Sequence, residues 1–75
     1  MERKIQVRGK TVDLKRVHKT EVQVYENIGI IELYINGHVF ANYRNLHEAV
    51  QDSDFIIDQA NKYQKNENRA KQGQK

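Results

Sequence analysis

The chain is 75 residues long, contains no Cys, and carries 13 Lys and Arg residues against 10 Asp and Glu residues. This length predicts one small domain with a thin core, and the lack of Cys excludes disulfides and thiolate metal sites. No stretch resembles a signal peptide or reaches the ~18 apolar residues of a membrane span, so we expect a cytoplasmic protein without membrane contact.

Charge is sorted into three blocks along the chain. Residues 1–20 carry seven bases and two acids, residues 21–60 one base and seven acids, and residues 61–75 five bases and one acid. Association between macromolecules is steered by the local field rather than by the total charge. The formal net charge of +3 therefore conceals a basic N-terminal block, an acidic middle block and a basic C-terminal block.

The first predicted element is a β-hairpin over residues 5–14, where apolar and polar residues alternate on both sides of Gly9. A two-residue loop of Gly9 and Lys10, with Gly9 at positive φ, would close this hairpin. All four apolar side chains then face one side, in the pairs Val7 with Val12 and Ile5 with Leu14.

Residues 15–29 are predicted to contain an irregular segment, an extended segment and a turn. Residues 15–20 show no clean period and predict a turn or bulge. Residues 21–25 alternate again, with Val22 and Val24 on one side. Residues 26–29 predict a turn, because Asn and Gly both tolerate left-handed backbone conformations.

Asn36-Gly37 is the strongest hairpin signal in the sequence. The flanking runs, residues 30–35 and 38–43, are rich in β-branched and aromatic residues. A two-residue loop here predicts the opposed pairs Leu33 with Phe40, Tyr34 with Val39 and Ile30 with Tyr43.

A helix is predicted to begin after Asn45, which would cap it, with Glu48 in the capping-box position. Apolar residues recur at helical spacing over residues 46–63 and form one stripe. The polar segment 52–54 leaves a second interpretation open, in which the helix breaks there and Phe55 turns into the core. An unbroken helix would instead expose Phe55 among acidic residues.

Together these elements predict an α+β fold of order ββββα. Two antiparallel β-hairpins share a face that is covered by one C-terminal amphipathic helix. Residues 1–64 form a single small domain in this interpretation. Residues 65–75 are polar, basic and without an apolar period, which predicts a flexible, disordered basic tail.

No pattern in the sequence predicts catalysis, a metal site or a cofactor. His18, His38 and His47 lack metal-ligand spacing, and the acidic residues 52–58 lack the glycine and terminal Glu of a calcium loop. Ser53 has no nucleophile elbow around it, and no glycine cluster could cradle a phosphate. We therefore expect a non-enzymatic protein without cofactors.

The first functional hypothesis is a nucleic-acid-associated regulatory protein that uses a basic hairpin and sheet face. Cations neutralise phosphates and aromatic rings stack on bases, and a two-stranded ribbon fits a major groove. The acidic helix face would lie on the opposite side, and the basic tail would add non-specific contacts. The predicted nucleic-acid-binding residues are Lys4, Arg8, Lys10, Lys15, Arg16, Lys19, Tyr25, Tyr34 and Tyr43.

The alternative hypothesis is a protein-binding modulator or inhibitor, of phage or mobile-element type, that docks on a larger host protein. Aromatic anchors are enriched at interface centres, and an exposed Phe55 would serve as one. A homodimer through sheet edges or through the outer residues Ile30 and Val39 belongs to the same class. The predicted interface residues are Phe55, Glu48, Asp52 and Asp58.

Overall fold

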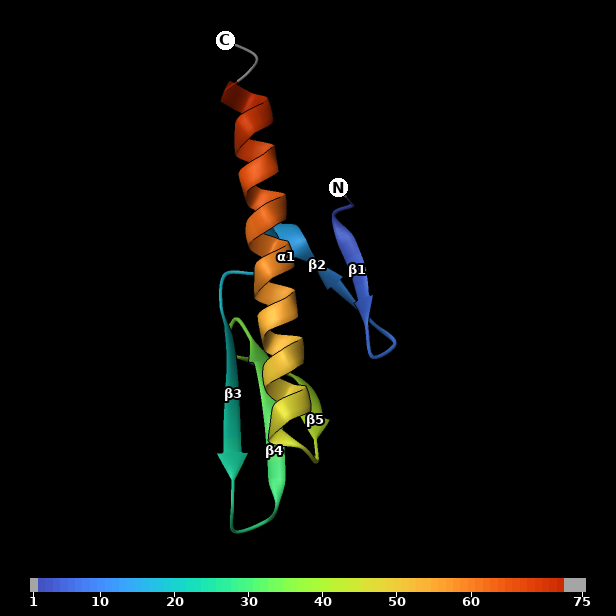
Figure 1. Cartoon of the computed structure of the whole chain (residues 1–75), viewed down its shortest axis with the longest axis vertical. Helices are drawn as coiled ribbons and strands as arrows, with labels where there is room; N and C mark the ends of the chain where they lie inside the picture. The colour runs from blue at the N-terminus through green and yellow to red at the C-terminus, as the bar shows by residue number, and fades with distance from the viewer. Residues whose placement is uncertain (1, 73–75) are drawn as a thin grey trace.

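The computed structural model describes residues 2–72, with only the backbone described for residues 68–72. Strands and one long helix follow each other along the chain, and a 3-10 turn, η1, lies between β2 and β3 (Figure 1). The elements are β1 (Lys4–Val7), β2 (Lys10–Asp13), η1 (Leu14–Arg16), β3 (Thr20–Tyr25), β4 (Ile30–Ile35), β5 (His38–Tyr43) and α1 (Leu46–Gln72).

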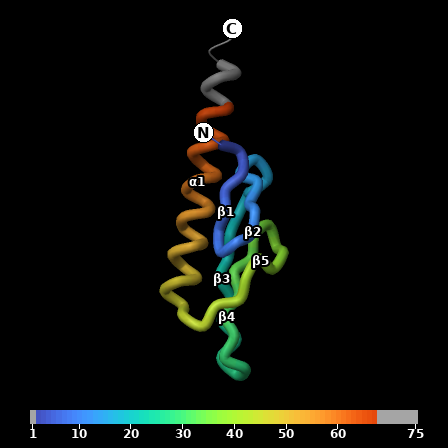
Figure 2. Tube along the Cα trace, turned by 90° about the vertical axis from the view of Figure 1, so that its right-hand side faces the viewer, coloured from blue at the N-terminus to red at the C-terminus, as the bar shows by residue number. Residues whose placement is uncertain are grey.

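The strands form two separate antiparallel sheets, a β1–β2 hairpin and a three-stranded sheet in the order β3-β4-β5. The helix lies along one side and the strands along the other (Figure 2). The predicted α+β class is confirmed. The predicted number of strands is wrong, because residues 20–25 add a third strand to the second hairpin and make five strands in all.

The β1–β2 hairpin turns one residue earlier than predicted. Its loop is Arg8-Gly9, and both residues have positive φ (52° and 76°), as a type I′ turn requires. The apolar side chains still share a face, because the pairing shifts by an even number of residues. The observed pairs are Ile5 with Val12 and Val7 with Lys10, in place of Val7 with Val12 and Ile5 with Leu14.

The irregular segment after β2 contributes to the core. Asp13 Oδ1 accepts a hydrogen bond from the backbone N–H of Lys15 (3.1 Å), which caps the 3-10 turn η1. Leu14 is completely buried in this turn, although its backbone N–H still donates to the Arg3 oxygen of the hairpin (2.7 Å), and Val17 is buried as well. Val17 lies in the stretch without an apolar period, so its burial was not predicted.

The Asn36-Gly37 hairpin is confirmed, and so is the pairing of Tyr34 with Val39. Beyond that pair β5 contains an unpaired residue, Phe40, which makes a β-bulge. A one-residue slip exchanges the two faces of a strand, so the rest of β5 is inverted relative to the prediction. The observed pairs are Leu33 with Ala41 and Ile31 with Tyr43, in place of Leu33 with Phe40 and Ile30 with Tyr43.

The helix begins where the sequence predicts. Asn45 Oδ1 accepts hydrogen bonds from the backbone N–H groups of His47 (2.8 Å) and Glu48 (3.4 Å), which confirms Asn45 as the N-cap. The helix then runs without interruption, so the break considered at residues 52–54 is wrong.

The helix also continues beyond the point where the tail was expected to begin. Residues 65–72 are helical, and residues 73–75 of the expected tail lie outside the described residues. Gln64 Nε2 donates to the backbone oxygens of Leu14 (3.1 Å) and Val17 (2.8 Å), which ties this part of α1 to η1. No helix among the described residues has the length and apolar character to span a membrane.

The core lies between the helix and the two sheets. Leu14, Leu33 and Ile56 are its largest fully buried side chains, and each comes from a different element. Ser53 interrupts the apolar stripe of the helix, but its hydroxyl donates to Thr20 Oγ1 (2.8 Å) and is satisfied. The core thus holds both sheets against one face of α1.

Candidate protein-interaction site

Arg8 joins the hairpin to the acidic part of the helix. Its Nε donates to Asp52 Oδ2 (2.6 Å), and its Nη2 lies 3.4 Å from Glu48 Oε2. Its guanidinium also stacks 4.4 Å from the centroid of the Tyr43 ring. Asp52 raises the pKa of Arg8 above its ordinary value. The predicted separation of a basic sheet face from an acidic helix face is therefore wrong.

Lys10 links the two sheets. It lies in β2 opposite Val7 and not at the hairpin tip, so its side chain extends toward the second sheet. Its Nζ donates to the backbone oxygen of Phe40 and lies 5.3 Å from the centroid of the Phe40 ring. The side chain thus occupies a backbone acceptor at the bulge in β5.

Most of the other predicted phosphate-binding cations also have acidic partners. Arg3, which was not among the predicted residues, binds Asp13 through Nε and Nη2 (both 2.9 Å), which holds the pKa of that carboxyl below its usual value. Exposed pairs of this kind contribute little to stability because solvent screens them, so they can exchange partners. The remaining pairs are Lys15 with Glu67 (3.7 Å), Arg16 with Asp13 (3.6 Å) and Lys19 with Glu21 (2.7 Å).

The three tyrosines predicted to line one outer face are divided. Tyr25 and Tyr34 lie on the outer face of the second sheet, where their hydroxyls are 3.0 Å apart. Tyr34 donates to Glu32 Oε1 (2.9 Å), and the bonds to Tyr25 and Glu32 raise the pKa of Tyr34. The Tyr34 hydroxyl is therefore bound to a carboxylate and to the Tyr25 hydroxyl.

Tyr43 was expected on the same outer face, and this expectation is wrong. The bulge in β5 turns its side chain inward, where it is only 5% exposed. Its hydroxyl donates to Asp52 Oδ2 (2.6 Å). Burial, together with this hydrogen bond, raises the pKa of Tyr43 to about 12.

The helix residues of the alternative hypothesis do not act as one group. Phe55 is 49% exposed, as an unbroken helix predicts. Glu48 and Asp52 contact the hairpin, whereas Asp58 Oδ2 pairs with Lys62 Nζ (3.1 Å) on the helix itself. Phe55 is thus exposed, while the three acidic residues predicted around it are all engaged in ion pairs.

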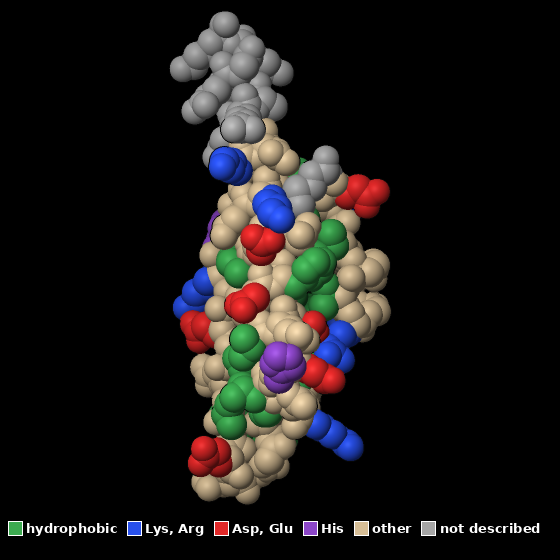
Figure 3. Space-filling view, viewed as in Figure 1, with side chains coloured by type: hydrophobic (Ala, Val, Ile, Leu, Met, Phe, Trp, Pro, Cys, Tyr) green, Lys and Arg blue, Asp and Glu red, His purple; other side chains and the backbone are tan. Residues whose placement is uncertain are grey.

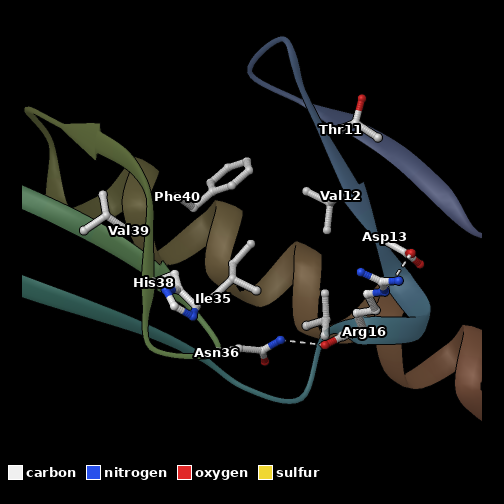
Figure 4. Close-up of a pocket in the computed structure, with 10 residues that line it drawn as sticks. Thr11, Val12, Asp13, Arg16, Ile35, Asn36, His38, Val39 and Phe40 are labelled. Atoms are coloured by element: carbon white, nitrogen blue, oxygen red, sulfur yellow. Dashed lines mark hydrogen bonds and ion pairs between the residues drawn. The ribbon is translucent and has the colours of Figure 1, made fainter.

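A groove of about 240 Å³ separates the β1–β2 hairpin from the three-stranded sheet (Figure 4). Val12, Ile35 and Phe40 point toward one another and make its floor apolar. Its residues come from β2, from the segment around η1, and from the β4–β5 hairpin. The full lining is Thr11, Val12, Asp13, Arg16, Val17, Ile35, Asn36, His38, Val39 and Phe40.

Side-chain contacts link the two sheets at either end of this groove. At one end Lys10 reaches the backbone oxygen of Phe40. At the other end Asn36 Nδ2 donates to the backbone oxygen of Arg16 (2.5 Å), while its Oδ1 accepts from the backbone N–H groups of His18 (2.8 Å) and Lys19 (3.1 Å). The groove is therefore held open between two fixed points.

Both long walls of the groove are strand edges. β2 pairs only with β1 and β5 only with β4, and within residues 2–72 no backbone hydrogen bond joins β2 to β5. Strand edges present unpaired backbone donors and acceptors that can pair with another chain. The groove thus combines an apolar floor with backbone groups along its sides.

The groove residues were not identified as a site from the sequence. Phe40 was expected in a regular pair with Leu33, and nothing local marks it as a bulge. Asn36 was assigned only a turn role, although its side chain also fixes the segment after η1. A groove between two sheets depends on how distant elements pack, so periodicity could not reveal it.

In the described part of the chain, no group of three His, Cys, Asp or Glu side chains could hold a metal ion. Comparison with protein-family models, with curated proteins and with solved structures finds no match to this chain.

Proposed function

We propose that this protein is a non-enzymatic binding module that takes up an extended segment of a partner protein in the groove between β2 and β5. The observation that carries this proposal is the pair of open strand edges on either side of an apolar floor. An added strand gains affinity from backbone hydrogen bonds and specificity from alternate side chains in pockets.

The charges around the groove favour an acidic segment. Asp13 is the one carboxylate in its lining, and it is already bound by Arg3 and Arg16. Lys10 lies at one end, and the Arg16 side chain is 81% exposed. Cations therefore exceed anions, and charge complementarity selects partners and raises association rates.

A titration followed by ¹⁵N–¹H spectra of the full chain would test this proposal. The probe is a capped peptide of about seven residues, the length of a typical strand, that alternates Glu and Val. We expect shifts to concentrate at Val12, Val39 and Phe40, because the Val side chains would cover the floor. A matched peptide with Lys in place of Glu should bind at least about tenfold more weakly.

Arg16→Glu should weaken binding of the acidic peptide by about tenfold. Lys65→Glu is the matched control, because it makes the same charge change on an exposed helix position and should leave affinity unchanged. Shifts that fall outside the groove, or no shifts at ~1 mM peptide, would overturn the proposal.

A nucleic-acid-associated function is the second candidate. It is favoured by one observation: η1 packs against the second half of α1, so Lys15 lies at the same end of the helix as Lys62 and Lys65 (Figure 1). Single- and double-stranded oligonucleotides added in the same titration distinguish the two candidates. Nucleic-acid binding predicts shifts around Lys4 and Lys15 that weaken linearly with the logarithm of salt concentration.

A further inference from the structure

The outer edge of β3 lacks the features that protect strand edges. In the described part of the chain β3 pairs only with β4, and its register is regular over all six residues. It contains no Pro and a single charged residue, Glu21. By contrast, β1 has only four residues, and the edges of β2 and β5 face each other across the groove. Proteins normally blunt free edges, so this edge is suited to pairing with another strand.

Exposed apolar side chains gather beside this edge, on the helix side of the sheet. Val24 is 48% exposed, Leu46 49% and Val50 41%. Figure 3 shows apolar side chains collected over β3 and the first turns of α1. Such contiguous patches mark interaction surfaces in soluble proteins.

The charges along β3 are arranged so that the edge is complementary to itself. His18 and Lys19 precede the strand, and Glu26 follows it. An antiparallel second copy of the same strand would place His18 of one copy opposite Glu26 of the other, with Lys19 next to that pair. A self-complementary edge of this kind fits a two-fold axis.

We propose that β3 pairs with β3 of a second copy of this chain around a two-fold axis at Val22. The result is a continuous six-stranded antiparallel sheet with both helices on one face. Opposed residues of an antiparallel pair share a face, so Val22 and Val24 stay on the helix side in both copies. The opposed pairs between copies are Val22 with Val22, Thr20 with Val24, Lys19 with Tyr25 and His18 with Glu26.

The position of the helix agrees with this axis. Ser53 Oγ and Thr20 Oγ1 lie 2.8 Å apart and fix the level of the helix on β3. Val50 precedes Ser53 by about one helical turn, a rise of about 5.4 Å. Val22 follows Thr20 by two strand residues, a distance of about 6.8 Å. Val50 therefore lies near the level of Val22. The axis therefore brings Val50 toward Val50 of the second copy and covers the apolar patch. The β2–β5 groove stays at the outer ends, and this inference does not depend on the function proposed for it.

Sedimentation equilibrium over protein concentrations from about 1 µM to about 1 mM tests this pairing. We expect a monomer–dimer equilibrium, and Val24→Glu should raise the dimer dissociation constant at least about 100-fold, because it buries a charge in the apolar interface. Asn42→Glu is the control, since Asn42 is an exposed residue of β5 that lies away from β3 and outside the groove. A monomer at every concentration, or equal dimerisation of the two variants, would overturn the inference.

A cross-linking experiment tests the register. The chain contains no Cys, so Val22→Cys introduces a single thiol. Opposed residues of an antiparallel pair have Cα atoms about 4.5–5.5 Å apart, within disulfide range. Mild oxidation should convert the Val22→Cys variant to a covalent dimer at least about tenfold faster than Asn42→Cys, because only the first thiol is pre-positioned opposite its copy. Equal cross-linking rates would contradict a two-fold axis at Val22.

Discussion

At the scale of single residues, Asp52 connects three elements. Its Oδ2 accepts from Arg8 in the first hairpin and from Tyr43 in β5, at 2.6 Å in each case. A buried hydroxyl must find a hydrogen-bond partner, and a carboxylate beside a guanidinium supplies a strong one. This carboxylate therefore ties the orientation of a buried ring to the position of the hairpin.

Tyr43 should make stability fall at alkaline pH. Its pKa in the folded protein is about 12, compared with 10.0 for an unperturbed Tyr. Between these values the unfolded chain loses the Tyr43 proton while the folded chain keeps it, so the unfolding free energy decreases as pH rises. Urea unfolding from pH 9 to about 12 measures this slope, and Tyr43→Phe should reduce it.

Tyr34 should contribute to the same loss of stability at alkaline pH, because its pKa is raised as well. Tyr34→Phe should also reduce the slope, and the two substitutions should add because the hydroxyls bind different carboxylates. A slope that is unchanged in Tyr43→Phe would show that the buried hydroxyl does not contribute to the alkaline loss of stability.

At the scale of elements, short polar side chains set where each element begins and how it faces. Asn45 starts α1 by accepting the first free backbone N–H groups, and Asp13 starts η1 in the same way. The bulge at Phe40 changes the face of β5 without ending the strand. These local devices place Tyr43 against the helix and open the groove beside Phe40.

Asn45→Ala should destabilise the protein by about 1 kcal/mol, because the N-cap hydrogen bonds are lost. The midpoint of urea unfolding measures the change. Asn61→Ala is the control, because position 61 is exposed in the middle of the helix. There Ala has the higher helix propensity, so this substitution should not destabilise the protein. Destabilisation of equal size in both variants would argue against a cap-specific effect.

At the scale of the whole molecule, the two sheets pack on one helix, but within the described residues no backbone hydrogen bonds join one sheet to the other. Within residues 2–72, the direct links between the hairpin and the second sheet are made by the side chains of Lys10 and Arg8, which reach Phe40 and Tyr43. Regions joined in this way open separately from the rest of a protein. The β1–β2 hairpin is thus expected to be the less stable unit.

Native-state hydrogen exchange of the Lys10→Met variant should show that the β1–β2 hairpin opens separately from the rest of the protein. The substitution keeps the apolar stem and removes the ammonium that binds the backbone oxygen of Phe40. We expect the opening free energy of the β1–β2 amides to fall by about 1 kcal/mol, while β3–β5 and α1 keep their protection.

Lys65→Met, which changes an exposed helix residue, should leave both sets of amides unchanged. Equal loss of protection in both sheets after Lys10→Met would mean that they unfold as one cooperative unit. The hairpin would then contribute to the stability of the groove along its whole length.

The sequence by itself determined the features that depend on neighbouring residues. Asn36-Gly37 must turn because both adopt positive φ readily, and Asn45 can cap because its side chain reaches the next backbone N–H groups. The continuous apolar stripe of α1 likewise follows from spacing along one helix. The α+β class was therefore predictable.

Only the tertiary structure decided which distant groups meet. The sequence places Lys10 in a basic block, but packing of the two sheets directs it to a backbone oxygen in β5. One unpaired residue at Phe40 turns Tyr43 from the outer face to the core. Dihedral preference and period are properties of adjacent residues, whereas register, charge pairing and the groove arise from contacts between segments far apart in the chain.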